Sequence, residues 1–461
     1  MSPSELPVAD PVESFWTALP NRLDDFRSSE LLPAECDVLI IGSGFAGVAT
    51  AYHMFNSTGP QSSFRTVMLE ARKLTSGATA RNGGHIKPDT YMGATKMASV
   101  YGMKQVAALQ KYETEQVYLV KQLVEKEGLD CDFHLTRACD VIMDPVVAEQ
   151  KAREYHQLVK EGLVDTKDIA YTPKKDAERI SGVKGAQCCF TFTAGHMWPR
   201  KMVHQMLEGL IQQGLQVHAH TPVLEISKSR DELGNWTVST PRGAIKAKKL
   251  VVCTNAYTSS VLPQYKNKII PVRGVCSRIS SPKGSKMPHL PSTYSLHFDA
   301  LQFDYLVPRT DGSIIVGGAR AAFWHDRDSW WHNKNDNEQV KDSAKYFDSY
   351  MQRYFHGWED SGAKLERIWT GIMGYSSDLV PHIGEVSGAP GQYICAGFSG
   401  HGMPHIFSAS KGVARMVVEG VSFEQTGLPA VCKETQARLD STVNHMEDTL
   451  KVVWERPREK L

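Results

Sequence analysis

The sequence lacks the features that place a chain in a membrane, outside the cell or on nucleic acid. No apolar run approaches the roughly 20 residues that a membrane-spanning helix needs, and no secretory signal opens the chain. The formal net charge of the 461 residues is only +1 at pH 7. Neither a nucleic-acid partner nor a membrane surface is therefore indicated, and an intracellular globular protein is predicted.

Disulfide and metal-cluster spacings are also missing. The nine cysteines include no C-x-x-C, and Cys188 and Cys189 are adjacent and cannot easily bridge each other. Reduced thiols inside the cell are the simplest interpretation. The last residues, R-E-K-L, only loosely resemble the peroxisomal S-K-L signal. We therefore expect a cytoplasmic location, with a peroxisomal one weakly supported.

One strong pattern is present, at residues 36–70. An apolar run at 36–41 is typical of a buried parallel strand and leads directly into G-S-G-F-A-G at 42–47. A helical stretch follows, and residues 65–70 are typical of a second strand that ends in Glu70. This order of strand, glycines, helix, strand and acid predicts a dinucleotide-binding unit, whereas the glycine motif alone would fit other glycine-rich turns.

Each part of this pattern has a physical function. Gly42 permits the tight turn out of the strand, Gly44 lets the backbone approach a pyrophosphate, and Gly47 lets the helix pack closely. The helix N-terminus offers free N–H groups and a partial positive charge to the phosphates. Glu70 follows at about the 20-residue spacing of an acid that accepts the ribose hydroxyls. A carboxylate at this place repels a 2′-phosphate, so NADP is disfavoured.

A second glycine-rich segment follows at residues 75–85, T-S-G-A-T-A-R-N-G-G-H. Such small and polar residues cannot form a core element, but their backbone can wrap a flat ligand. An exposed flexible linker is the alternative that composition leaves open. The position directly after the ribose-binding acid favours the ligand.

These motifs resemble a known family. G-S-G-F-A-G, then L-E-A-R, then S-G-A-T-A-R-N-G-G is similar to the FAD-dependent oxidoreductases of the D-amino-acid oxidase and sarcosine oxidase type. The gamma-glutamylputrescine oxidoreductase-like branch and related fungal proteins are the most similar in pattern. Later motifs extend the resemblance over about residues 36–420: T-N-A-Y at 254–257, P-V-R-G at 271–274, W-x-G at 369–371, D-x-x-P-x-I-G at 378–384 and G-x-x-G-H-G at 397–402.

The resemblance implies an FAD cofactor, with the first glycine loop on its ADP part and the second loop beside the flavin ring. Val223 is implied to meet the adenine edge through its backbone. The residues implied to bind FAD are Gly42, Gly44, Phe45, Ala46, Gly47, Glu70, Ala71, Arg72, Ser76, Gly77, Ala78, Thr79, Arg81, Asn82, Gly83, Gly84, Val223, Thr254, Asn255, Ala256, Gly371, Asp378, Gly397, Gly400, His401, Gly402 and Met403.

Three residues beside the implied flavin are candidates for catalysis: His401, Arg81 and His85. The resemblance places His401 at the start of a helix that faces flavin N1 and O2, where N–H groups and the helix dipole stabilise negative charge on the reduced ring. His401 and His405 lie four residues apart, which could suit a metal, but no third ligand is apparent. We therefore expect no metal.

The chain departs from the family at positions that affect the flavin. Relatives with a covalent flavin use a His in the early loop or a Cys in the late W-x-G region, and Arg81 and Gly371 occupy those places here. Dissociable FAD is therefore predicted, although His85 is close enough in sequence to leave covalent attachment open. Monomeric sarcosine oxidases have a lysine beside the ring that helps oxygen react, and this chain has Ile315 near that position. They have a second lysine after the G-H-G loop, where this chain has Met403-Pro404.

The predicted fold is α/β, with a Rossmann-type FAD-binding domain and a substrate domain that contains a mixed or antiparallel sheet. The predicted segments are an N-terminal arm at 1–35, a discontinuous FAD-binding domain at 36–98, 195–262 and 365–420, a substrate domain at 99–194 and 263–364, and a C-terminal extension at 421–461. Periodicity also predicts helices over 95–128 and 338–355, a hairpin over 303–320, and an aromatic loop over 324–336 that lines a pocket or is simply irregular.

These features predict a flavoenzyme that oxidises the C–N bond of an amine or amino acid. The resemblance implies hydride transfer from the α-carbon of the neutral amine to flavin N5, an imine product, and oxygen as acceptor with hydrogen peroxide formed. Three alternatives stay open: a dehydrogenase that passes electrons to a protein or quinone, a nicotinamide-dependent reductase, and a non-catalytic FAD-binding protein. The predicted partner is a small molecule; the sequence identifies neither the substrate nor the oligomeric state.

Overall fold

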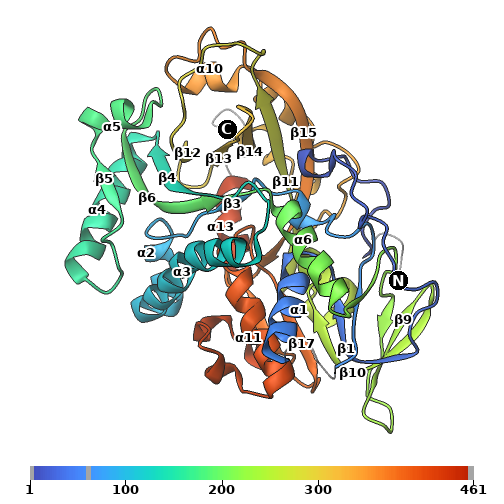
Figure 1. The fold of residues 1–461 in the computed structure, drawn as a ribbon. Coiled ribbons are helices and arrows are strands. Elements are labelled where there is room, and N and C mark those ends of the chain that lie inside the picture. Colours follow the sequence, from blue (N-terminus) through green and yellow to red (C-terminus); the bar gives the residue numbers. More distant parts are fainter. Residues whose placement is uncertain (1–4, 59–63, 455–461) are drawn as a thin grey trace.

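The computed structural model describes residues 5–58 and 64–454, which form two large sheets with helices packed around them (Figure 1). Parallel and antiparallel strands occur together with helices, which confirms the predicted α/β class. Among the described residues, no helix is both long and apolar enough to cross a membrane.

The first sheet has eight strands and a parallel centre. Its parallel strands follow the order β17-β10-β1-β2-β7, and β16 pairs antiparallel with β17 at one edge. Helix α1 (Phe45–Thr58) packs against both α6 (Pro199–Gln212) and α11 (Ile406–Glu419). The strands are β1 (Glu35–Ile41), β2 (Thr66–Leu69), β7 (Gln216–His218), β8 (Glu225–Ile226), β9 (Trp236–Thr240), β10 (Gly243–Val252), β16 (His382–Glu385) and β17 (Gln392–Ala396).

The second sheet has nine strands in the order β15-β11-β14-β13-β12-β4-β6-β3, with β5 beside β6. Neighbouring strands in this sheet pair antiparallel, except that β12 and β4 are parallel. The predicted hairpin forms between β13 and β14. The strands are β3 (His85–Ile86), β4 (His134–Ile142), β5 (Ala170–Thr172), β6 (Cys188–His196), β11 (Ile269–Ser280), β12 (Thr293–His297), β13 (Phe303–Pro308), β14 (Ile314–Gly318) and β15 (Lys364–Ser376). Strands β3 and β15 hydrogen-bond in this sheet although their residues fall mostly in the expected FAD-binding segments, so the domain boundaries stay a prediction.

The remaining helices differ from expectation in two places. The helix predicted over 95–128 is divided at Gly102, whose φ of +80° ends one helix and begins the next. The continuous helix predicted over 338–355 is wrong, because left-handed residues at Asp342 and Ser349 break it into two short helices. The remaining helices are α2 (Ala94–Tyr101), α3 (Met103–Glu127), α4 (Pro145–Glu161), α5 (Lys174–Ser181), α7 (Thr258–Val261), α8 (Arg320–Phe323), α9 (Ser343–Tyr346), α10 (Tyr350–Tyr354), α12 (Gln436–Asp440) and α13 (His445–Trp454).

Both end segments pack against the body of the molecule. In the N-terminal arm, Trp16 is fully buried, and its Nε1 donates to the carbonyl oxygen of Asn82 at 2.6 Å. In the C-terminal segment, Arg438 pairs with Asp378, and Glu434 meets His382 in the interior. The two segments therefore hold loops that the sequence assigns to the cofactor.

Candidate functional site

The glycine turn after β1 is tightly packed. Gly42 has a φ of +106°, and a Cβ there would lie 2.7 Å from the carbonyl oxygen of Cys253. A Cβ on Gly47 would lie 2.0 Å from the carbonyl oxygen of Gly42. No side chain larger than hydrogen fits at either position without moving backbone, so these two glycines hold α1 close to the sheet.

Glu70, one residue beyond β2, lies beside this turn. Its Oε2 accepts hydrogen bonds from the backbone N–H and the hydroxyl of Ser43, at 3.0 and 2.8 Å. Its Oε1 accepts one from the backbone N–H of Arg72 at 3.1 Å. These bonds fix the carboxylate beside the glycine turn, and its ribose-binding role stays a prediction.

The carboxyl ends of the parallel strands bring further cofactor candidates to the same edge of the sheet. Thr254 follows β10, and its backbone nitrogen lies 3.7 Å from the position of a Cβ on Gly42. Asn255, with a φ of +43°, accepts a hydrogen bond from the backbone N–H of Gly397, which follows β17. Val223 is buried a few residues after β7. Ligands of open α/β sheets bind at this edge.

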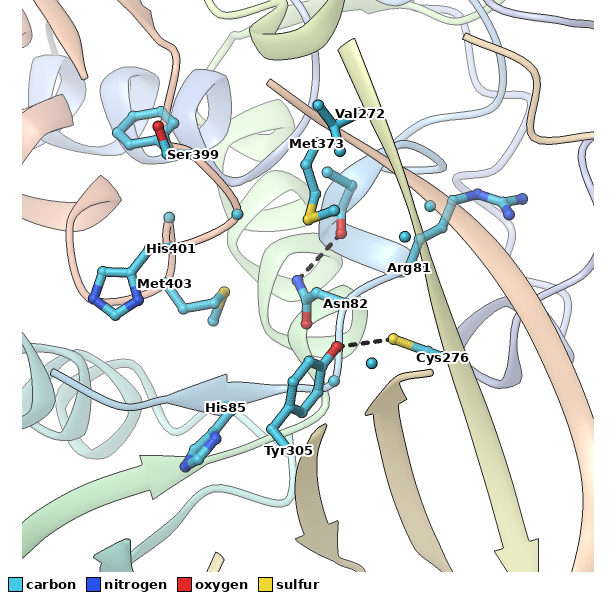
Figure 2. Close-up of a pocket in the computed structure, with 18 of the residues that line it drawn as sticks. Arg81, Asn82, His85, Val272, Cys276, Tyr305, Met373, Ser399, His401 and Met403 are labelled. Carbon is cyan, nitrogen blue, oxygen red and sulfur yellow. Dashed lines mark hydrogen bonds between the residues drawn. The ribbon is translucent and has the colours of Figure 1, made fainter. Parts of the chain in front are cut away.

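A cavity of about 400 Å³ lies further along, lined by strands of the second sheet and by loops that include those following β10 and β17 of the first (Figure 2). The expected site residues that line it are Ala78, Thr79, Arg81, Asn82, Gly83, His85, Asn255, Gly371, Gly400, His401, Gly402 and Met403. The expected residues that lie outside its lining are Gly42, Gly44, Phe45, Ala46, Gly47, Glu70, Ala71, Arg72, Ser76, Gly77, Gly84, Val223, Thr254, Ala256, Asp378 and Gly397. The candidates thus fall into two groups, one near the glycine turn and one around the cavity.

The segment at residues 75–84 joins these two groups. At its start, the backbone N–H of Thr75 donates to the hydroxyl of Ser43 at 2.9 Å. In its middle, the hydroxyl of Thr79 accepts from the backbone N–H of Phe45, the first residue of α1. At its end, Gly83 lies so close to Tyr305 that a Cβ would come within 2.2 Å of the ring. A long ligand with phosphates at the turn and a flat ring in the cavity fits this path, and FAD is such a ligand.

Several cavity residues were missed by the sequence analysis. They come mainly from the second sheet and the loops beside it, and no motif marks them: Lys87, Asp89, Met92, Cys276, Ser295, His297, Phe303, Tyr305, Arg320, Phe323, Met373 and Tyr375. The loop over 324–336 does line the pocket, because Trp324 and Trp330 are both buried and both face it.

Arg81, a predicted catalytic residue, is engaged by other groups of the protein. Its guanidinium donates to the carbonyl oxygens of Ser76, Thr370 and Val12 at 2.6 to 3.1 Å. It also pairs with the buried carboxylate of Asp336 at 3.3 Å. Burial lowers the pKa of Arg81 to about 10 despite the attraction of Asp336, so the group stays charged at neutral pH. Figure 2 shows the guanidinium directed away from the cavity, where it holds loops together.

Two expected cofactor contacts are also engaged elsewhere. Arg72 forms a buried ion pair with Asp336 at 2.9 Å. Asp378 is held by Arg438, with 2.7 Å from Nε to Oδ2 and 2.9 Å from Nη2 to Oδ1. Both side chains therefore position the loops of the site, and neither lines the cavity.

His85 lies at the cavity wall as a neutral group. Its Nε2 is 2.7 Å from the hydroxyl of Thr293. Burial, together with repulsion from Lys87, lowers the pKa of His85 well below its ordinary value. Cys276 also reaches the cavity, with its Sγ 2.9 Å from the hydroxyl of Tyr305, and burial raises the pKa of this thiol to about 12. Neither side chain is an activated nucleophile.

His401 is placed differently from expectation. Helix α11 begins at Ile406, so His401 precedes the helix in the glycine loop. Its Nε2 lies 2.7 Å from Oε2 of Glu113 on α3, and the Nε2 of His405 lies 3.0 Å from Oε1 of the same carboxylate. One buried carboxylate therefore connects two imidazoles across the cavity wall.

Glu113 and His401 each favour the charged form of the other. Burial alone would lower the pKa of His401, but the attraction and hydrogen bond of Glu113 raise it above its ordinary value. Burial alone would raise the pKa of Glu113, and the two histidines instead hold it well below its ordinary value. A positive charge on His401 beside the cavity is therefore favoured.

The side chains of Glu113, His401 and His405 also bear on the metal site that the sequence analysis considered. Glu113 is the third potential ligand that was not apparent there, and its oxygens lie within 4.8 Å of the nitrogens of His401 and His405. Each carboxylate oxygen already accepts one imidazole, so hydrogen bonding accounts for the arrangement. The prediction that no metal binds remains a prediction.

Comparison with known proteins gives a consistent result. The family model described as "DAO: FAD dependent oxidoreductase" matches residues 37–416. Gamma-glutamylputrescine oxidoreductase of Escherichia coli (strain K12) is 21% identical over 417 residues, which span 89% of this chain and 90% of that protein. Human mitochondrial dimethylglycine dehydrogenase is 24% identical over 400 residues, 83% of this chain but 42% of that protein. The crystal structure of glycine oxidase from Geobacillus kaustophilus has a TM-score of 0.67 at 17% identity, covering 88% of this chain and 99% of that one.

Proposed function

Since the chain belongs to the DAO family of FAD-dependent oxidoreductases, we propose that it oxidises the carbon–nitrogen bond of an amine or amino acid. The observation that carries the proposal is the continuous path along residues 75–84, from the glycine turn beside Glu70 to the cavity beside the second sheet. Names of similar proteins, gamma-glutamylputrescine oxidoreductase and glycine oxidase, agree with an amine or amino-acid substrate.

The proposed cofactor residues follow from this path. Gly42, Gly44 and Gly47 would receive the pyrophosphate, and Glu70 would accept the ribose hydroxyls. The flat ring would lie against the backbone of the cavity loops, because Gly371 and Gly400 have no side chain to keep it away. Space at Gly400 is limited, since a Cβ there would lie 2.9 Å from the Met373 sulfur. These contacts hold the cofactor without a covalent bond.

When bound, FAD accepts the two electrons and the hydrogen that leave the substrate carbon beside the nitrogen. The chain itself contributes orientation and electrostatics. Apolar side chains such as Val272, Met373 and Met403 line the cavity and would reduce its water content once cofactor and substrate are bound. His85 and His297 have lowered pKa values, to about 4 for His297, so these uncharged imidazoles do not repel a basic amine. His401, held by Glu113, places positive charge where negative charge develops.

Molecular oxygen is the proposed electron acceptor. One structural observation favours a different acceptor. Ile315 occupies the position at which the resemblance to monomeric sarcosine oxidases implies a lysine that helps oxygen react. Its side chain is fully buried in a cluster with Trp16 and Trp369. No cationic group can take that place without repacking the cluster. A dehydrogenase that passes electrons to a protein or quinone is therefore the alternative.

The experiment that tests the proposal uses the FAD-loaded protein under anaerobic conditions. A panel of amines and amino acids is mixed with it, and the flavin absorbance near about 450 nm is followed. We expect at least one compound to bleach the flavin and to yield the carbonyl product of imine hydrolysis. Admitting air or a quinone to the bleached protein then identifies the acceptor, with hydrogen peroxide formed in the first case. Flavin that no compound of the panel bleaches contradicts the proposed function.

A further inference from the structure

A second cavity, the side cavity, adjoins the main cavity described above and has a volume of about 220 Å³. Its lining shares Asp89, Phe398, Ser399 and His401 with that of the main cavity. Figure 2 shows Ser399 and His401 beside the main cavity, on the loop that follows β17. The two cavities therefore meet at this loop, and the imidazole of His401 can contact the contents of both.

Two buried polar atoms point to water in the side cavity. They are Nδ1 of His405 and Oγ1 of Thr90, and neither has a hydrogen-bond partner within residues 5–58 and 64–454. Both residues are only 6% exposed. A buried polar atom without a hydrogen bond costs free energy, and ordered water commonly supplies the missing bond. One water needs roughly 10–15 Å³ of such space, so several fit in this cavity.

The side cavity also lies close to the molecular surface. Its lining includes Gly93 and Met97 beside α2 and Leu379 after β15, and all three residues are partly exposed. Water in the side cavity can therefore exchange with the surrounding solvent, and protons can pass through it.

Glu113 holds one edge of the His401 ring. Its Oε2 lies 2.7 Å from Nε2 of His401 and accepts the backbone N–H of Asp89 at 2.7 Å. Burial alone would raise the pKa of Glu113, but His401 and His405 hold it well below its ordinary value, so Nε2 of His401 keeps its proton. In the described part of the chain, Nδ1 of His401 has no hydrogen-bond partner, and the side chain is 39% exposed. Nδ1 is therefore the ring atom that can gain or lose a proton.

The charge of His401 is set by its neighbours. The titratable groups that face it are Glu113, Asp89, Lys87, His85 and His405. Burial lowers the pKa of His401, but the attraction and hydrogen bond of Glu113 raise it above its ordinary value. Asp89 adds to this effect, and Lys87 opposes it. The imidazole can therefore hold a proton near neutral pH and can also release it.

We propose that Nδ1 of His401 exchanges protons with water in the side cavity, and that the proton of a cationic amine leaves the main cavity by this route. The inference rests on the proposed function and adds a proton path to it. An arriving ammonium group repels the charged imidazole, so the Nδ1 proton passes to water in the side cavity. Nδ1 then accepts a proton from the ammonium, and the electron pair of the broken N–H bond stays on the nitrogen. One proton leaves for each amine, the amine becomes neutral, and His401 regains its positive charge.

The test follows the imidazole of His401 by NMR in the FAD-loaded protein, with isotope-labelled histidine, over a range of pH. His401→Gln identifies the signal by its loss. We expect Nε2 to stay protonated and Nδ1 to titrate with a midpoint above the ordinary value of 6.5. In Glu113→Gln the midpoint should fall, because the carboxylate that favours the positive charge is gone.

Filling the side cavity tests its connection to His401. Ala94 lines the side cavity and not the main one, so Ala94→Phe should displace water from the side cavity alone. Because the charged imidazole then loses water, its midpoint should fall by about 1 pH unit, less than the roughly 3–5 units of complete burial. Ala98→Phe is the matched control, because Ala98 lies one turn further along α2 and lines neither cavity. Its midpoint should equal that of the wild type.

Flavin reduction by an active amine tests the proton transfer itself. The rate should fall on the acid side of the His401 midpoint, and this fall should move to lower pH in Glu113→Gln together with the midpoint. In Ala94→Phe the proton loses its route, so reduction above the midpoint should slow about 10- to 100-fold. Ala98→Phe should reduce the flavin at the wild-type rate.

The opposite results overturn the proposal. Titration of Nε2 in place of Nδ1, or an unchanged midpoint in Ala94→Phe, shows that water in the side cavity does not serve His401. If Ala94→Phe does not fold, Leu109→Phe fills the same cavity from α3 and is judged by the same midpoint. A normal rate of flavin reduction in a variant with a lowered midpoint overturns the proton route. A flavin that no amine bleaches refutes the proposed function, whereas a lowered midpoint in Ala94→Phe still supports exchange through the side cavity.

Discussion

Oε2 of Glu113 lies 2.7 Å from Nε2 of His401, although the two residues are 288 positions apart in the sequence. The carboxylate comes from the long helix α3, and the imidazole comes from the glycine loop before α11. Helix α3 therefore sets the charge of a loop that borders the cavity. We therefore expect the contribution of this contact to depend on pH.

The first prediction concerns that dependence. The pKa of His401 is raised, so its share of the stability is present below its unfolded value, near 6.5, and is lost as pH rises through the raised value. The pKa of Glu113 is lowered, so its share is present above about 4.5 and is lost as pH falls through the lowered value. Glu113→Gln should therefore cost most stability between about pH 4.5 and 6.5. Urea unfolding of both proteins across this range measures the difference, and a cost independent of pH contradicts the ion pair.

The second prediction concerns the role of His401 in the reaction. His401→Ala removes one donor beside the cavity and leaves the backbone N–H groups of the loop in place. Since donors of this kind act mainly on developing charge, flavin reduction by an active amine should slow about 10- to 1,000-fold. FAD occupancy should change little, because the glycine turn and Glu70 are distant from the substitution. Stopped-flow reduction is the measurement; a normal rate with lower stability would assign His401 a structural role only.

The third prediction concerns attachment of the flavin. Acid precipitation should release FAD into the supernatant, because Arg81 is engaged with Asp336 and carbonyl oxygens and Gly371 has no side chain. Colour that stays with the pellet would contradict this. Peptide mapping would then begin with His85 and Cys276, two of the cavity side chains whose chemistry permits a covalent bond.

The local part of the site could be predicted from the sequence. Gly42, Gly47 and Glu70 lie within one contiguous strand–helix–strand unit, so their spacing alone determines that they meet at the end of the first sheet. Ser43, which hydrogen-bonds Glu70, is part of the same motif.

The distant contacts could not be predicted, because spacing does not encode them. Glu113 appears in the sequence as one polar residue of an amphipathic helix, and only the packing of α3 directs it to His401. The sequence predicts Arg81 as a flavin contact but gives no sign of its buried partner Asp336, which lies far away along the chain. Periodicity over 338–355 identified a real buried face, but the hydroxyls of Tyr346 and Tyr350 turn toward Asp304, and the helix is broken there.

The last prediction tests the glycine turn itself. A Cβ on Gly44 would lie 3.3 Å from the hydroxyl of Thr79, so Gly44→Val places a branched side chain where the pyrophosphate must approach the backbone. The purified variant should lose its yellow colour while its secondary structure, measured by circular dichroism, survives. Gly209→Ala is the control, because Gly209 lies inside α6 with open space around it and alanine favours helix. That variant should keep FAD and gain or retain stability. Stoichiometric FAD in Gly44→Val would show that the pyrophosphate lies elsewhere, and the path along residues 75–84 would then lose its assigned beginning.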